Sequence, residues 1–127
     1  MTLITKSSYV DGAFVPLDSS TDVLENRNPS NPGEVIERFV RADKDLTEQA
    51  IAAARRAAPG WARSNPQVRA DALDFIGTEI LARREELARL LSREEGKIVR
   101  EALGEVDRAG RSFKFYAQEV LRAEGEK

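Results

Sequence analysis

Residues 98–124, IVREALGEVDRAGRSFKFYAQEVLRAE, form the longest segment of helical periodicity in the chain. Gly104 and Gly110 each cost about 1 kcal/mol relative to alanine in a helix interior, so we expect another element to pack closely against both. The segment is similar to a coiled-coil seam, but its small residues favour packing inside a globular domain. The apolar and small residues recur every three or four positions and so share one helix face: Val99, Ala102, Leu103, Val106, Ala109, Phe113, Ala117, Val120 and Leu121.

Working back from this segment, a first helix is predicted over residues 44–58. It begins at Asp43, or at a capping box formed by Asp45 and Glu48, and it ends before Pro59. Its alanines allow a close approach to a neighbouring element, and its tryptophan is the expected anchor. The predicted face consists of Leu46, Ala50, Ala53, Ala54, Ala57 and Trp61.

Two further helices are predicted between these two segments of the sequence. One opens with Asn65 as the N-cap and Pro66 at the first helical position, where the missing N–H has no intrahelical partner. Its predicted apolar stripe is Val68, Ala72, Phe75, Ile76 and Ile80. The other covers residues 85–95, ends at Gly96, and should bury Leu87, Leu90 and Leu91.

Residues 7–42 are predicted to form a β-ribbon of short strands. Asp11-Gly12 stands inside the apolar stretch 9–15, which indicates a hairpin with a type I′ turn. Strands are expected over 23–27 and 35–40, with the turn formers of residues 28–33 as the loop between them. The fold class is therefore α+β and mostly helical, with the ribbon followed by about four helices over residues 43–125.

Composition excludes several classes of function. The 127 residues carry 20 basic and 22 acidic side chains, a net charge of −2 that would recruit neither nucleic acid nor an anionic membrane. The chain has no Cys and no His, which rules out thiolate or imidazole chemistry by its own residues. Neither a signal peptide nor a membrane span is visible, so a cytoplasmic protein is expected.

Charged clusters offer the only alternative chemistry. Glu101, Glu105 and Asp107 could bind a cation, but the nearby arginines favour ion pairs; these are Arg100, Arg108 and Arg111. Gly96-Lys97 could mimic a phosphate site, yet a helix-ending glycine followed by a solvated lysine is the favoured interpretation. Residues alone therefore predict no catalytic, cofactor-binding or metal site.

Several segments, taken together and in order, resemble the N-terminal region of aldehyde dehydrogenases. The segment NPSNPGEVI, residues 28–36, resembles that family's NP-(A/S)-(T/N)-GEVI sequence with one inserted residue. The segment at residues 85–97 resembles its ELA-x-L-(E/D)-(T/S)-x-E-x-GK sequence. Further matches are residues 9–15, 50–62, 69–73, 105–106 and 113–117, and details at 24–36, 79–97 and 104–110 look most like dehydrogenases of 2-oxoglutarate semialdehyde.

The resemblance implies that residues 1–127 are the N-terminal portion of an NAD(P)-binding domain, without the catalytic domain. The family uses NAD or NADP and a catalytic cysteine, which attacks the aldehyde before hydride transfer and thioester hydrolysis. The resemblance places the cysteine, the general-base glutamate and the cofactor turn beyond the matched region. It also suggests Asp107 as a ligand for a monovalent cation, with carbonyl groups of Asn26 and Arg27, although this is not included among the predicted sites.

Two hypotheses follow for the role of the chain. The first is an inactive N-terminal fragment of such an enzyme, which binds no cofactor alone and pairs with the missing C-terminal part. The second is a free-standing helical oligomerisation or interaction module that self-associates. A cation-binding regulatory domain using the acidic cluster is a third and weaker alternative.

Overall fold

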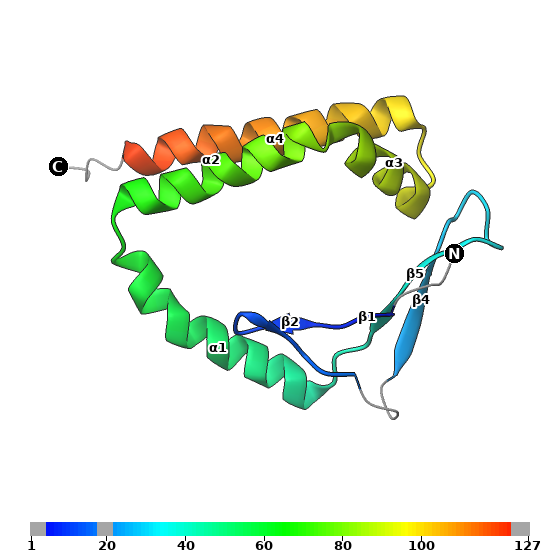
Figure 1. The fold of residues 1–127 in the computed structure, drawn as a ribbon, viewed down its shortest axis with the longest axis horizontal. Helices are drawn as coiled ribbons and strands as arrows, with labels where there is room; N and C mark the ends of the chain where they lie inside the picture. The colour runs from blue at the N-terminus through cyan, green and yellow to red at the C-terminus, as the bar shows by residue number, and fades with distance from the viewer. Residues whose placement is uncertain (1–4, 18–21, 123–127) are drawn as a thin grey trace. The chain divides into compact units, whose positions relative to one another are not determined.

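The structure is a computed structural model that describes residues 5–17 and 22–122 (Figure 1). The chain divides into two units, residues 1–63 and 64–127, each with its own internal packing. The first unit contains β1 (Thr5–Lys6), β2 (Tyr9–Val10), β3 (Ala13–Phe14), β4 (Val23–Arg27), β5 (Val35–Val40) and α1 (Lys44–Ala62). The second contains α2 (Pro66–Ala82), α3 (Arg84–Glu95) and α4 (Val99–Leu121). About 62% of the structure is helical, which confirms the predicted fold class.

The central sheet of the first unit has three strands in the order β1-β5-β4. β4 and β5 pair antiparallel around the loop at residues 28–33, as predicted, with Glu25 opposite Arg38. β1 pairs parallel with the other edge of β5 and lies before the predicted start at residue 7. Sequence patterning missed β1 because a strand of two residues is too short to show alternation.

The predicted hairpin is formed by β2 and β3, which pair antiparallel. Asp11 has a φ of 53° and Gly12 a φ of 84°, the two positive values that a type I′ turn requires. The rings of Tyr9 and Phe14 meet edge to face across the hairpin, with their centroids 5.0 Å apart. β2 lies against α1, where Arg56 forms an ion pair with Asp11 at 3.0 Å.

The ends of α1 correct two predictions. Asp43 is the N-cap and accepts a hydrogen bond from the Leu46 N–H at 2.8 Å, so the alternative capping box that starts at Asp45 is wrong. The helix also continues through Pro59 to Ala62. Proline removes only its own N–H, and its carbonyl still accepts a hydrogen bond from Arg63 at 3.3 Å. On the predicted face only Ala53 is buried, while Trp61 is about half exposed within the chain.

α2 begins as predicted, with the Asn65 side chain accepting a hydrogen bond from the Gln67 N–H at 2.9 Å. α2 then runs along α4 (Figure 1), but it packs through a different face from the one predicted. Ala70 and Gly77 are its buried residues, whereas Phe75 is 65% exposed. The predicted stripe is a continuous helix face, yet within this chain most of it lies in solvent.

Small residues decide which faces meet. A Cβ added at Gly110 would lie 2.6 Å from the Leu81 Cγ, and one at Gly77 would lie 2.8 Å from the Gly110 carbonyl oxygen. Both distances are too short for real atoms, so glycine is required on each side for this approach. The predicted close packing against Gly110 is confirmed. The predicted close packing against Gly104 is wrong, because nothing would lie within 4 Å of a Cβ added there.

α3 ends at Gly96 with a left-handed φ of 75°, as predicted, but it begins at Arg84, one residue earlier than expected. Its Ala88 is fully buried against Ala102 and Val106 of α4. Leu87 and Leu91, which were predicted to be buried, are partly buried and pack around this small cluster together with Ile80 and Leu103. Leu90, also predicted to be buried, is half-buried outside it. Apart from these contacts, few large side chains are fully enclosed in the described part of the second unit.

α4 is shorter than predicted. It ends at Leu121 with Arg122 as the C-cap, and the predicted continuation over residues 123–124 lies outside the described residues. Val99, Ala109 and Leu121 of the predicted face are exposed, whereas Gly110 is buried. Among the helices of residues 5–17 and 22–122, none is long and apolar enough to cross a membrane.

The two interior glycines of α4 should respond oppositely to a methyl group. Gly104→Ala should stabilise the chain by about 1 kcal/mol, because the new Cβ meets open space and alanine favours the helix. Gly110→Ala should destabilise it by about 1–3 kcal/mol, because its Cβ collides with Leu81. Urea unfolding followed by circular dichroism measures both. Equal shifts in the same direction would show that the helix contact is misplaced.

Candidate functional site

The acidic side chains of α4 do not gather into a cation site. Glu105 binds the Lys97 ammonium at 2.5 Å, and Asp107 accepts a hydrogen bond from the Arg84 Nε at 2.6 Å. Glu101 is exposed. Within the described ranges, no three acidic side chains are placed to hold a metal ion. Glu105 and Asp107 thus form ion pairs, as predicted.

The partners in these pairs differ from those predicted. Within the described residues, Arg100, Arg108 and Arg111 form no ion pair, and Arg84 and Lys97 pair with the acidic residues of α4 instead. The pair between Arg83 and Glu86 has the i,i+3 spacing that sequence alone could have identified. The pair between Arg84 and Asp107 joins α3 to α4 across 23 residues, which spacing could not indicate.

Lys97 is an anchor rather than a solvated side chain, which corrects the prediction. Its side chain is only 18% exposed and lies between Glu105 at 2.5 Å and Glu95 at 2.6 Å. The Ser92 hydroxyl donates to the Lys97 carbonyl at 2.6 Å, which fixes the turn between α3 and α4. The two carboxylates raise the pKa of Lys97, Glu105 more than Glu95. A lysine engaged in this way is not available to bind phosphate.

Asp107, which the family resemblance suggests as a ligand for a cation, forms an ion pair with Arg84. The guanidinium donates to that carboxylate, and this hydrogen bond is the main cause of the raised pKa of Arg84. The negative charge that a monovalent cation would need is already neutralised.

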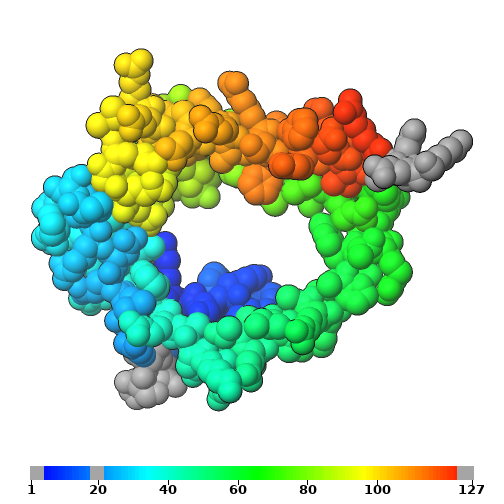
Figure 2. All heavy atoms as spheres, turned by 180° about the vertical axis from the view of Figure 1, so that it is seen from behind, coloured from blue at the N-terminus to red at the C-terminus, as the bar shows by residue number. Residues whose placement is uncertain are grey.

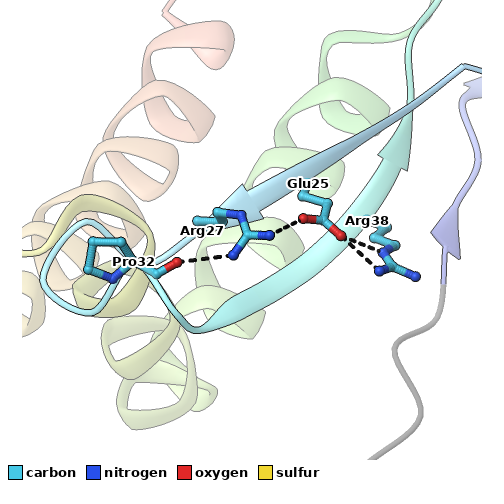
Figure 3. A network of polar contacts seen from close by, with 4 residues as sticks. All are labelled: Glu25, Arg27, Pro32 and Arg38. Carbon is cyan, nitrogen blue, oxygen red and sulfur yellow. Dashed lines mark hydrogen bonds and ion pairs between the residues drawn. The ribbon is translucent and has the colours of Figure 1, made fainter.

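A further polar network lies on β4 and β5 (Figure 3). Glu25 accepts hydrogen bonds from Arg38, through Nε at 3.0 Å and Nη2 at 2.8 Å, and it also pairs with Arg27. Arg27 in turn donates through Nη1 to the Pro32 carbonyl at 3.0 Å. The network therefore connects the two strands to the loop between them.

The loop itself is closed by its own asparagine. The Asn28 Oδ1 accepts from the Ser30 N–H at 2.9 Å, and its Nδ2 donates to Glu34 at 2.8 Å. These contacts define the shape of residues 28–33. The carboxylates of Glu25 and Glu34 are both engaged in these contacts, so the network has a structural role.

The exposed apolar surface is the remaining candidate for function. On α2, Val68 is 53% and Phe75 is 65% exposed, and together with Ala72 and Ile76 they form what we call the α2 apolar face. Monomeric proteins rarely leave large contiguous apolar patches in water, so such a face marks a contact surface. Phe115 and Tyr116 are also exposed on α4, which Figure 2 shows in front of α2 when viewed from behind.

Comparison with known proteins gives a consistent result. Residues 14–127 match the model of the aldehyde dehydrogenase family. The 3,6-anhydro-alpha-L-galactose dehydrogenase of Vibrio sp. strain EJY3 is 40% identical over 114 residues, covering 90% of this chain and 23% of that protein. The alpha-ketoglutarate semialdehyde dehydrogenase of Haloferax volcanii is 32% identical over 120 residues, covering 94% of this chain and 25% of that protein.

A solved structure agrees with these relatives. The NAD-dependent aldehyde dehydrogenase from Sinorhizobium meliloti superposes with a TM-score of 0.88 at 31% identity, covering 98% of this chain and 25% of that one. The chain thus spans about a quarter of the length of the proteins it matches.

The Glu25 network should be visible in acid titration. Its hydrogen bonds, first from Arg38 and then from Arg27, lower the pKa of Glu25 below the ordinary value of 4.5. The resulting stabilisation is therefore present above pH 4.5 and is lost as the pH falls through the lower folded-state pKa. Carbon-detected NMR of the side chain should show an upward shift of its midpoint in Arg38→Ala.

Arg41→Ala provides the matched control, because Arg41 pairs with Asp22 rather than with Glu25. It should leave the Glu25 midpoint where it is. A midpoint that stays unchanged in Arg38→Ala, or moves equally in both variants, would contradict the network.

Proposed function

Since the chain belongs to the aldehyde dehydrogenase family, we propose that it forms the N-terminal portion of the NAD(P)-binding domain of an enzyme that oxidises an aldehyde to a carboxylate. The family match over residues 14–127 carries this proposal. Homologous enzymes act on semialdehydes, among them the Haloferax volcanii relative, and the Sinorhizobium meliloti neighbour is NAD-dependent. We extend the proposal to 2-oxoglutarate semialdehyde as the substrate and to NAD or NADP as the cofactor.

The residues that the chain contains indicate which catalytic groups a C-terminal part of the enzyme would have to supply. Thioester formation in this family needs a thiolate, and none of the 127 residues is a cysteine. The chain also has no Gly-x-Gly-x-x-Gly turn for a dinucleotide phosphate. The nucleophile, the general base and the cofactor turn are therefore assigned to a C-terminal part, which the helices of this chain would support.

The exposed α2 apolar face supports this division. Burying a side chain such as Phe75 or Val68 stabilises a protein by about 1.5–3 kcal/mol, and this burial is not achieved within the chain. A C-terminal part that covers the face would provide it. The proposed partner is therefore protein, recognised chiefly through apolar contact.

The 127-residue chain alone should produce no NAD(P)H from any aldehyde, because it has no thiol to form the thioester. An absorbance assay with both nicotinamide cofactors and 2-oxoglutarate semialdehyde measures this. The completed enzyme, in which this chain is followed by a catalytic part, should turn the same substrate over. NADH formation by the pure chain, or an inactive completed enzyme that is folded, would overturn the proposal.

A second candidate is a free-standing interaction module that binds another copy of itself. The same α2 apolar face favours it, because self-association is the other way to bury Phe75. The two candidates differ in what covers the face: a C-terminal catalytic part or a second chain.

Phe75→Glu should weaken self-association, because a charge would have to be buried in the contact. The parent chain should sediment as a concentration-dependent oligomer, whereas the variant should shift towards monomer in sedimentation velocity. Arg89→Glu, an exposed position on α3, is the control and should behave like the parent. A parent chain that is monomeric at all concentrations would eliminate the module.

A further inference from the structure

β4 is an edge strand of the three-stranded sheet, and its outer side has no partner strand within the described residues. At one end of its ladder with β5, the Arg41 N–H donates to the Asp22 carbonyl at 2.9 Å. At the other end, the Asn28 N–H donates to the Glu34 carbonyl at 3.1 Å. These two bonds show which backbone groups of β4 face β5.

The hydrogen-bonding groups of an antiparallel strand alternate between its two sides. Asp22 and Asn28 are bonded to β5, so every second residue between them faces away from it. These residues are Val23, Glu25 and Arg27, and no hydrogen bond of the described residues uses their backbone N–H or C=O groups. We call this row of backbone groups the β4 edge. Unpaired backbone groups on an edge strand are a template for a further extended segment.

The side chains of the β4 edge carry opposite charges. Glu25 and Arg27 project from one face of the sheet, because side-chain direction in a strand repeats every two residues. Figure 3 shows the Glu25 carboxylate between the guanidinium groups of Arg27 and Arg38. A segment with complementary charge therefore presents a base opposite Glu25 and an acid opposite Arg27.

A second copy of β4 meets this requirement when it lies antiparallel, with Glu25 of each copy opposite Arg27 of the other. Outward backbone groups then face outward backbone groups, and the register is symmetric about Asn26, as a two-fold axis requires. The charged side chains form a ring in which acid and base alternate. The register that sets Glu25 opposite itself also matches the backbone groups, but it brings like charges together.

We propose that the β4 edge binds the β4 edge of a second copy of this chain, antiparallel and in the register centred on Asn26. Each Glu25 exchanges two backbone hydrogen bonds with Arg27 of the other copy, and the two side chains form a cross-strand ion pair. A contact between two strands of five residues is small, so the complex is weak and transient. The inference goes beyond the proposed function, because it assigns a contact surface in the first unit, whereas the α2 apolar face belongs to the second.

Amide hydrogen exchange of the 127-residue chain, followed by NMR over a range of concentrations, tests the pairing. The N–H groups of Leu24 and Asn26 face β5 and should be protected at every concentration. Those of Glu25 and Arg27 should exchange rapidly in dilute solution and slow by about tenfold or more as the concentration rises. This alternation along one strand distinguishes edge pairing from association through α2, which leaves the β4 edge open.

Charge reversal then identifies the occupant as a second copy. E25R and R27E each put like charges opposite one another, so each variant alone should self-associate about tenfold or more weakly than the parent. In an equimolar mixture the arginines of one chain face the glutamates of the other, and association should recover. Sedimentation equilibrium with Phe75→Glu present in every chain measures this without a contribution from the α2 apolar face.

R55E is the matched control, because it makes the same change of charge as R27E at an exposed residue of α1. It should associate like the parent. Circular dichroism confirms that each variant is folded. Should E25R fail to fold, the exchange measurement on the parent chain decides alone.

Three results would overturn the pairing. The first is exchange of the Glu25 and Arg27 amides that does not depend on concentration, and the second is a mixture that associates no better than its components. The third is full protection of these amides at every dilution in the completed enzyme, which would assign the β4 edge to a later segment of the same polypeptide. None of these results depends on aldehyde oxidation, so the dehydrogenase proposal stands or fails separately.

Discussion

The close approach of α2 and α4 at Gly77 and Gly110 is the contact on which the second unit depends. An added Cβ at either position would clash, with the Gly110 carbonyl oxygen in one case and with Leu81 in the other. Because neither residue has a side chain, the two helix backbones can lie together along their length (Figure 1). Lys114 secures the same crossing from its edge, donating to Asp74 and Thr78 at 2.8 Å each.

This contact also determines which surfaces remain for function. With the glycine side of α2 turned towards α4, the side that carries Phe75 is turned away from it. The buried residues of the unit are then mostly alanines, and larger apolar side chains such as Leu87 and Leu91 are only partly buried. A chain that packs in this way leaves an apolar surface exposed for contact with other protein atoms.

Sequence reasoning succeeded where the signal is local. The Asp11-Gly12 turn, the caps at Asn65 and Gly96, and the extents of β4 and β5 each depend on a few adjacent residues. Sequence reasoning was wrong about which face of α2 packs against α4. The Phe75 side of α2 is the more apolar, but the Gly77 side is the packed one, because close helix contact rewards small residues over large ones.

The ion-pair partners of the charged side chains also could not be predicted from local sequence. Their preference for ion pairs was predictable from composition, yet the partners of Asp107 and Glu105 come from α3 and from the turn after it. The positions of Arg84 and Lys97 depend on how α3 folds back on α4, and no spacing rule provides that.

A nuclear Overhauser experiment on the 127-residue chain tests the central claim most directly, because it reports which side of α2 meets α4. We predict strong cross-peaks between the Gly110 Hα protons and the Leu81 methyl groups, with none from the Phe75 ring to α4 in the same molecule. Cross-peaks from Phe75 to the buried side of α4, with those between Gly110 and Leu81 absent, would contradict the account.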